Sequence, residues 1–161
     1  MTKAEYLSWF DQVLAPTEPT FRRVPSDKLE YKLTEHSFSL GQLLRHIPGS
    51  FLFMAKVINR EAIEWKSLPE ILLANRRHGS ATVEEGIRLL HEYTSRFKRS
   101  IESLSEEDFQ RGTIDTPQLG NIPYWRYAAF ALEHHIHHFM ELHLTLKSLG
   151  VHVNTKTLYA G

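Results

Sequence analysis

The residue type best suited to chemistry in this chain is histidine, which occurs ten times among 161 residues. Four of the ten lie in the run Glu-His-His-Ile-His-His that starts at Glu133. If this run is helical, His134 and His138 lie on one face with Cβ atoms about 5–6 Å apart, so both imidazoles can reach one metal ion. Burying the pair without a partner would be costly. The alternative is a cluster of surface histidines, which is how we interpret the neighbouring His135 and His137.

A third ligand is needed, because a catalytic zinc-type site usually has three protein ligands and a water molecule. His46 is the best candidate, since it lies in the apolar stretch of another predicted helix. Pro48 follows it, and a proline inside a helix removes a backbone hydrogen bond at a cost of roughly 3 kcal/mol. We therefore expect a kink or bulge just after His46, where function often explains a departure from local rules. The remaining histidines are interpreted as ordinary satisfied core or surface residues: His36, His78, His91, His143 and His152.

Other kinds of metal site lack their motifs in this sequence. The chain has no cysteine, which excludes zinc ribbons, iron–sulfur clusters and a thiol nucleophile. Di-iron bundles use a Glu-x-x-His pair and zincins use His-Glu-x-x-His, and neither pattern occurs. A mononuclear site with three histidines is the arrangement that remains.

Four long helices are predicted to position these residues. Thr2 with Glu5 and Ser39 with Gln42 form capping boxes, which mark the starts of the first two helices. Thr82 and Glu85 cap the third helix, which carries the clearest apolar stripe, and a short helical turn is expected at residues 105–109. The fourth helix starts near Pro123 and ends where Gly150 can form a left-handed cap. The predicted long helices are residues 3–14, 40–58, 83–104 and 123–149.

The connections complete the expected fold. Residues 15–38 contain three prolines and lack a sustained period, so we expect a long crossover over the surface. Residues 111–121 are expected to form a loop because they contain glycine and proline. No alternating strand pattern is apparent, so the fold class predicted is all-α, a four-helix bundle with a long crossover connection, in a single domain over residues 1–161.

The composition excludes several classes of partner. Lysine plus arginine and aspartate plus glutamate number 19 each, so no net positive field attracts nucleic acid or anionic lipid. The pairs Arg22-Arg23 and Arg76-Arg77 are interpreted as solvated surface. No apolar run approaches the roughly 18 residues of a spanning helix, and the amino terminus lacks the apolar segment of a secretory signal. We expect a cytoplasmic protein that contacts neither membrane nor nucleic acid.

Three stretches resemble the DinB/YfiT-like superfamily, the damage-inducible metal-binding proteins rather than the DNA polymerase of the same name. These are residues 39–46, residues 133–150 and the closing Thr-Leu-Tyr at 157–159, so the resemblance covers essentially the whole chain. It implies a four-helix bundle, commonly a homodimer, that binds one divalent ion, nickel or zinc, through His46, His134 and His138. The glutamine usual one turn after the second helix-four histidine is replaced by Glu141. This residue could be a fourth ligand, a base or a hydrogen-bond partner, and we favour the last role.

The resemblance constrains the site more closely than the reaction. Characterised members include bacillithiol-type thiol transferases, a mycothiol-dependent isomerase and metal-dependent hydrolases. We therefore expect a metal-dependent enzyme that activates a thiol or water against a small-molecule substrate, with catalytic residues unknown and Glu141 a weak candidate. The alternative is a non-catalytic metal- or ligand-binding stress-response protein. Phe53, Tyr127 and Phe130 could line a pocket, but aromatic residues at helical spacing are more typical of core packing.

Overall fold

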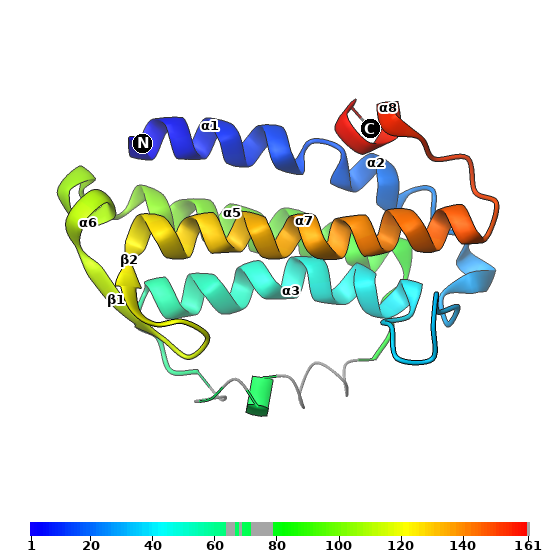
Figure 1. Cartoon of the computed structure of the whole chain (residues 1–161), viewed down its shortest axis with the longest axis horizontal. Coiled ribbons are helices and arrows are strands. Elements are labelled where there is room, and N and C mark those ends of the chain that lie inside the picture. The colour runs from blue at the N-terminus through cyan, green and yellow to red at the C-terminus, as the bar shows by residue number, and fades with distance from the viewer. Residues whose placement is uncertain (64–66, 68, 72–78, 161) are drawn as a thin grey trace.

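The computed structural model describes residues 1–63, 67, 69–71 and 79–160. Four long helices dominate it (Figure 1): α1 (Lys3–Leu14), α3 (Leu40–Ile58), α5 (Val83–Glu102) and α7 (Tyr124–Ser148). Shorter helical segments are α2 (Thr17–Phe21), the 3-10 turn η1 (Ser26–Lys28), α6 (Glu106–Arg111) and α8 (Thr155–Ala160). The strands β1 (Thr113–Thr116) and β2 (Gly120–Pro123) form a small hairpin.

The four long helices form the predicted bundle. In Figure 1, α7 runs between α1 and α3 and in front of α5. Helix α3 has its most extensive contacts with α5 and then with α7. The Tyr6 hydroxyl on α1 donates a buried hydrogen bond of 2.8 Å to the backbone oxygen of Ala128 on α7. The all-α four-helix expectation is confirmed, and within the described residues no helix is long and apolar enough to span a membrane.

Local capping chemistry explains where the helices start and end. Thr2 and Ser39 both form complete capping boxes, with Glu5 and Gln42 respectively. The Thr82 hydroxyl accepts a hydrogen bond from the third backbone N–H of α5. Gly150, just after α7, has φ of +76°, a conformation that glycine adopts without a steric cost. The predicted starts of the first three long helices and the glycine cap of the fourth are confirmed.

Pro48 does not interrupt its helix with a bulge. Residues Leu40–Ile58 are α-helical throughout, so the bulge expected after His46 is wrong. Because proline has no N–H, the carbonyl of Leu44 receives no hydrogen bond from position 48. Gly86 of α5 lies against this turn, where a Cβ would be 3.1 Å from the Leu44 oxygen. Helix α5 therefore packs closely against the turn of α3 in which the Leu44 carbonyl lacks its helical hydrogen bond.

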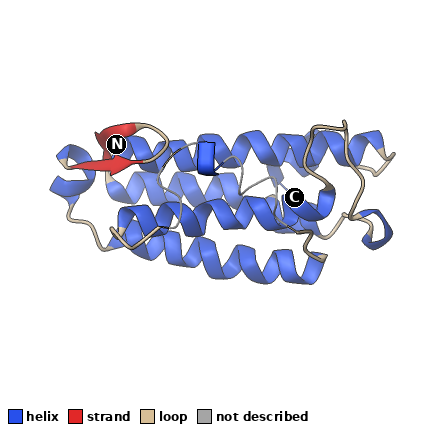
Figure 2. Cartoon of the chain, turned by 90° about the horizontal axis from the view of Figure 1, so that it is seen from below, coloured by secondary structure: helices blue, strands red, loops and turns tan. Residues whose placement is uncertain are grey.

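Two segments expected to be loops contain regular structure. The crossover includes α2, in which Thr17, Thr20 and Phe21 are buried rather than lying on the surface. Residues expected to form the loop before α7 contain the hairpin, which Figure 2 shows at one end of the bundle. Its strands are four residues each, too short for alternation to be recognised. Gly120, with φ of +69°, allows the tight reversal between them.

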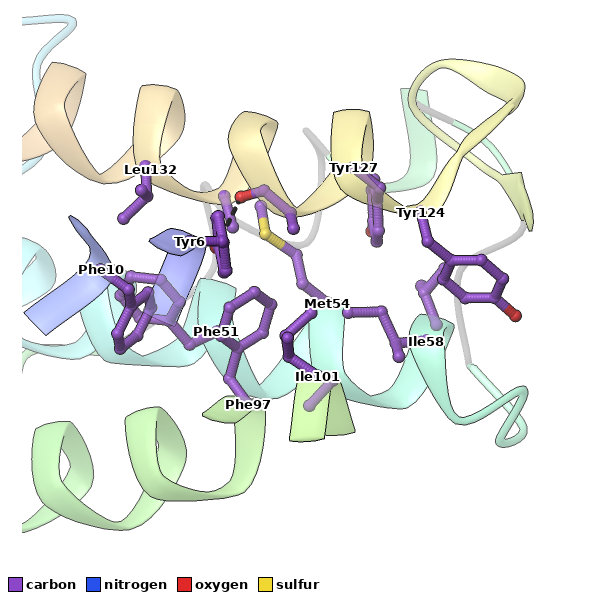
Figure 3. Packing of buried hydrophobic residues seen from close by; sticks show 14 of the residues in the cluster. Tyr6, Phe10, Phe51, Met54, Ile58, Phe97, Ile101, Tyr124, Tyr127 and Leu132 are labelled. Atoms are coloured by element: carbon purple, nitrogen blue, oxygen red, sulfur yellow. Dashed lines mark hydrogen bonds between the residues drawn. The ribbon is translucent and has the colours of Figure 1, made fainter. Parts of the chain in front are cut away.

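The core consists of two apolar clusters that meet near the middle of the bundle. The first, shown in Figure 3, contains Phe10, whose ring centroid lies 5.4 Å from those of both Phe51 and Phe97. The second contains residues from the start of α3 and the end of α7, including Leu43 and Leu146. On α7, His134 and His138 lie between Leu132 of the first cluster and Leu142 of the second, whereas His46 on α3 lies next to Ile47, the last α3 residue of the second cluster.

Candidate metal centre

The structure brings together the three histidines predicted to be ligands. His46 lies on α3, whereas His134 and His138 lie one turn apart on α7. Their ring centroids are 5.2 Å apart for His46 and His134, 4.4 Å for His46 and His138, and 4.6 Å for the α7 pair. One ring nitrogen from each residue lies within 4.8 Å of the other two. The pairing of α3 with α7 is therefore what assembles the site.

These distances suit a single metal ion. Imidazole nitrogens bind divalent ions such as zinc at about 2.0–2.1 Å, which holds ligand nitrogens roughly 3–4 Å apart. Three nitrogen donors without a protein thiolate suit zinc, nickel, copper or iron, so the donor set does not distinguish nickel from zinc.

The electrostatic surroundings keep His134 neutral. Burial first, and then the positive charge of His138, His135 and His137, lower its pKa to about 3. Its Nδ1 atom is buried and has no hydrogen-bond partner among the described residues. A neutral imidazole retains the lone pair that a metal ion requires. His134 is therefore neutral and lies within reach of the other two imidazoles, as a metal ligand has to be.

Glu141 orients His138 and also contacts the crossover. Its Oε2 atom lies 3.0 Å from Nδ1 of His138, and its Oε1 atom accepts the backbone N–H of Phe38 at 3.3 Å. Because an ionised carboxylate only accepts hydrogen bonds, Nδ1 of His138 carries the proton and Nε2 remains available to a metal. This geometry matches the hydrogen-bonding role favoured for Glu141 from the sequence.

Phe38 forms an aromatic wall of the site that sequence reasoning missed. Its ring stacks on His46 with centroids 4.7 Å apart and lies edge-on to His138 at 5.6 Å. The signal that could have identified it is its position directly before the Ser39 cap, where a hydrophobic residue packs back onto the helix. The crossover thus contributes to the site as well as connecting helices.

The three aromatic residues considered for a pocket belong mainly to the core. Tyr127 is fully buried, and Phe53 and Phe130 pack against the first cluster. Phe130 also lies 6.1 Å from His134 between ring centroids, so it borders the site. A cavity of about 460 Å³ lies elsewhere, between the end of α3 and the hairpin, and none of the three histidines lines it.

Two other histidines differ from their interpretation. His135 is only 1% exposed, so its assignment to the surface is wrong; it lies between Phe51 and Phe139, and its Nε2 atom is 3.2 Å from the Thr17 hydroxyl. His143 is also buried, but its Nδ1 atom, like that of His135, has no partner in the described part of the chain. The apolar residues four and seven positions after His135 were the available signal.

The remaining histidines agree with their interpretation where they are described. His137 is exposed, as are His36, His91 and His152, and His91 contacts Glu18 at 2.7 Å. Arg22 and Arg23 are likewise on the surface. The expectations for His78 and for the pair Arg76-Arg77 concern positions outside the described residues.

Comparisons with known proteins agree with this architecture. The family model described as the DinB superfamily matches residues 10–142, a span that includes the three histidines and Glu141. The structure of a DinB-like protein, YjoA, from Bacillus subtilis is similar, with 25% identity, a TM-score of 0.67, and coverage of 93% of this chain and 94% of that one.

A second DinB-like protein, from Bacillus cereus, has a TM-score of 0.75 over 95% of this chain and 96% of that one. At 11% identity, that likeness concerns the fold alone. A comparison with curated proteins finds no match. The resemblance seen in the sequence is confirmed by the family match and by the bundle architecture, and the chain belongs to the DinB superfamily.

Proposed function

We propose that the protein binds one divalent metal ion through His46, His134 and His138 and uses it to activate a thiol or a water molecule. The observation that carries this proposal is the convergence of three imidazoles from two helices within 4.8 Å. Membership of the DinB superfamily supports it. Nickel and zinc are the ions we favour, and a small molecule or low-molecular-weight thiol is the substrate class.

The side chains have distinct roles in this proposal. His46, His134 and His138 supply three neutral donors, and Glu141 keeps Nε2 of His138 directed toward the ion through the hydrogen bond to Nδ1. An ion held by only three protein ligands has positions open to water or a thiol and lowers the pKa of the group bound there. Phe38 covers His46 and His138 and limits the access of bulk water from that side.

A second candidate function is non-catalytic binding. His46 belongs to α3 and is 4% exposed, whereas the other two histidines belong to α7. An ion bound by all three would link two helices that are distant in sequence and stabilise the bundle even without turnover. This arrangement supports a structural metal as the alternative.

Metal content is the first measurement that tests the proposal. We expect about one equivalent of metal by plasma mass spectrometry in untagged protein, and its loss in folded His46→Ala, His134→Ala and His138→Ala variants. His137→Ala is the matched control, because His137 lies on the same helix turn but is exposed. A wild-type protein that stays empty after incubation with nickel and zinc would contradict the three-histidine site.

Activity separates the two candidate functions. The metal-loaded protein is tested with monochlorobimane and a series of thiols, and in parallel with ester and amide substrates. Turnover that disappears in the three histidine variants and persists in His137→Ala supports an enzyme and identifies the activated group. Stoichiometric metal with no turnover in either screen favours the non-catalytic role.

A further inference from the structure

A cavity of about 460 Å³ lies between the end of α3 and the hairpin, away from the three histidines. Its volume falls within the usual range of small-molecule pockets, which is about 300–1,000 Å³. Val57, which lines it, follows His46 by eleven residues on α3, and this corresponds to about 16 Å along the helix. In Figure 1 the hairpin and the last turn of α3 lie at the end of the bundle where α7 begins. We call this space the end cavity.

Arg60, which lines the end cavity, has an unusual backbone conformation. Its φ is +55°, and among the described residues every other positive φ belongs to a glycine. The N–H of Arg60 donates to the Val57 oxygen at 3.0 Å, and that of Glu61 donates to the Lys56 oxygen at 2.9 Å. These two bonds form the Schellman motif that ends α3. Its left-handed position is normally a glycine, because a Cβ is sterically unfavourable there.

Helix α7 ends in the same motif but with the usual residue. The N–H of Gly150 donates to the Lys147 oxygen at 3.0 Å, and that of Val151 donates to the Leu146 oxygen at 3.1 Å. Gly150 therefore has in α7 the position that Arg60 has in α3. An arginine held in a conformation that favours glycine indicates that its side chain has a use at this place.

Two opposite charges at the end cavity lack an ion-pair partner among the described residues. The guanidinium of Arg60 has neither an ion pair nor a hydrogen bond within that part of the chain. Oδ1 of Asp115 accepts a hydrogen bond of 2.8 Å from Nδ2 of Asn121, and this neutral amide leaves the charge of the carboxylate uncompensated. Arg60 and Asp115 line the same cavity but are not paired with each other. The cavity is therefore bordered by one available cation and one available anion.

The other carboxylate of the end cavity, that of Glu61, already has its partners. Its Oε1 atom accepts a hydrogen bond of 3.0 Å from the Asn59 amide, and its Oε2 atom accepts one from Arg96 on α5. These contacts hold the chain that follows α3 against α5, so this wall of the cavity is fixed. The apolar part of the lining comes from Val57, Ile63 and Ile114.

We propose that the end cavity binds a small zwitterion with an apolar body, the class of free amino acids and short peptides. The carboxylate of this ligand binds Arg60, and its ammonium group binds Asp115. The planar guanidinium suits a carboxylate because it can donate two parallel hydrogen bonds. Both residues are exposed, so solvent screens their charges and we expect a dissociation constant of about 1 mM. This site is separate from the metal centre and does not rest on the proposed reaction.

Matched ligands test the two charged contacts. Leucine and leucylleucine are zwitterions with branched apolar side chains, and NMR titration of the isotopically labelled protein locates their binding. At least one of them should shift the amide signals of Arg60, Ile114 and Asp115 in a saturable way. The N-acetyl derivative of that ligand lacks the ammonium group, and its carboxamide derivative lacks the carboxylate. Each derivative should bind about five- to tenfold more weakly.

Variants separate binding from folding. Arg60→Gly should weaken binding of the zwitterion about five- to tenfold without lowering Tm, because glycine is favoured at this position. Asp115→Asn should weaken the zwitterion but not its N-acetyl derivative. Gly150→Arg, the matched control, places the same side chain at the equivalent position of α7 and should lower Tm without changing binding.

Three results would overturn the proposal. The first is that neither zwitterion shifts the amide signals of the end cavity. The second is that the derivatives bind as tightly as the zwitterion, since apolar contacts alone would then account for binding. The third is that folded Arg60→Gly binds the zwitterion like the wild type.

Discussion

Glu141 and His138 lie one turn apart on α7 and are joined by a contact of 3.0 Å between Oε2 and Nδ1. The same carboxylate accepts the backbone N–H of Phe38, whose ring stacks on His46. One side chain therefore orients a candidate ligand and holds the end of the crossover against the site. We therefore expect Glu141 to influence how tightly the three histidines bind a metal ion.

Replacing Glu141 tests that role. Glu141→Ala removes the acceptor for Nδ1 of His138, so we expect metal affinity to fall roughly 10–100-fold, the usual effect of losing such a partner. Glu141→Gln retains a carbonyl oxygen that can accept the same hydrogen bond, so its affinity should lie closer to the wild type. Competition with a chromophoric chelator measures both. Equal losses in the two variants would indicate that the negative charge, and not the hydrogen bond, is what matters.

Metal removal should lower thermal stability. A ligand present at 100 times its dissociation constant stabilises the folded state by about 2.7 kcal/mol. For a chain of this size that corresponds to a rise in Tm of about 5–11 °C. Differential scanning calorimetry with and without a chelator measures the rise. It should vanish in His46→Ala and persist in His137→Ala; a rise that survives in His46→Ala would place the metal elsewhere.

Acid should destabilise the metal-free protein through its buried histidines. Burial lowers the pKa of His135 to about 3, whereas in the unfolded chain it titrates near 6.5. At pH values between about 3 and 6.5, His135 is protonated in the unfolded state but not in the folded state. The free energy of unfolding therefore decreases as the pH falls below 6.5. One such histidine accounts for up to about 1.4 kcal/mol per pH unit.

The variant His135→Phe isolates this contribution, because the new ring fits beside Phe51 and Phe139 and does not titrate. Urea unfolding of the metal-free variant at pH 5, 6, 7 and 8 should show a shallower pH dependence than the wild type. Parallel curves for the two proteins would mean that folding does not shift the pKa of His135.

The contact between α1 and α7 can be measured with one hydroxyl group. Tyr6→Phe removes the buried hydrogen bond to the Ala128 oxygen, and we expect the free energy of unfolding to fall by about 0.5–1.5 kcal/mol. Tyr159→Phe, at a site that is 75% exposed, is the control and should change stability by less than about 0.5 kcal/mol. Urea denaturation of both variants provides the comparison, and equal effects would show that the hydroxyl of Tyr6 contributes nothing specific.

The features predicted correctly from the sequence depend on local chemistry. The capping boxes at Thr2 and Ser39 involve residues three positions apart, so the helix starts could be identified without knowing the fold. His134 and His138 share a helix face for the same reason. The convergence of His46 with them depends on how α3 packs against α7, which no local pattern specifies. The position of His46 in a predicted helix made it only a candidate for the third ligand, and the family resemblance implied the same residue.

The incorrect expectations concern features that packing decides. His135 was interpreted as a surface residue together with His137, yet α2 covers it through Thr17. Helix α2 itself, with only five residues, is too short for a helical period to be recognised. A kink or bulge was expected after His46, and of these the bulge is absent, because α3 continues as an α-helix through Pro48 with α5 packed at Gly86.

The position of the three histidines near the boundary of the two apolar clusters has a consequence for how the chain opens. Each cluster can behave as a separate cooperative unit in hydrogen exchange, because contiguous groups of contacts open together. An ion bound to His46, His134 and His138 would tie α3 to α7 at the boundary between these units. In the presence of metal, hydrogen exchange of the amide protons in both clusters should report one common free energy of opening. Without it, the two halves should exchange independently.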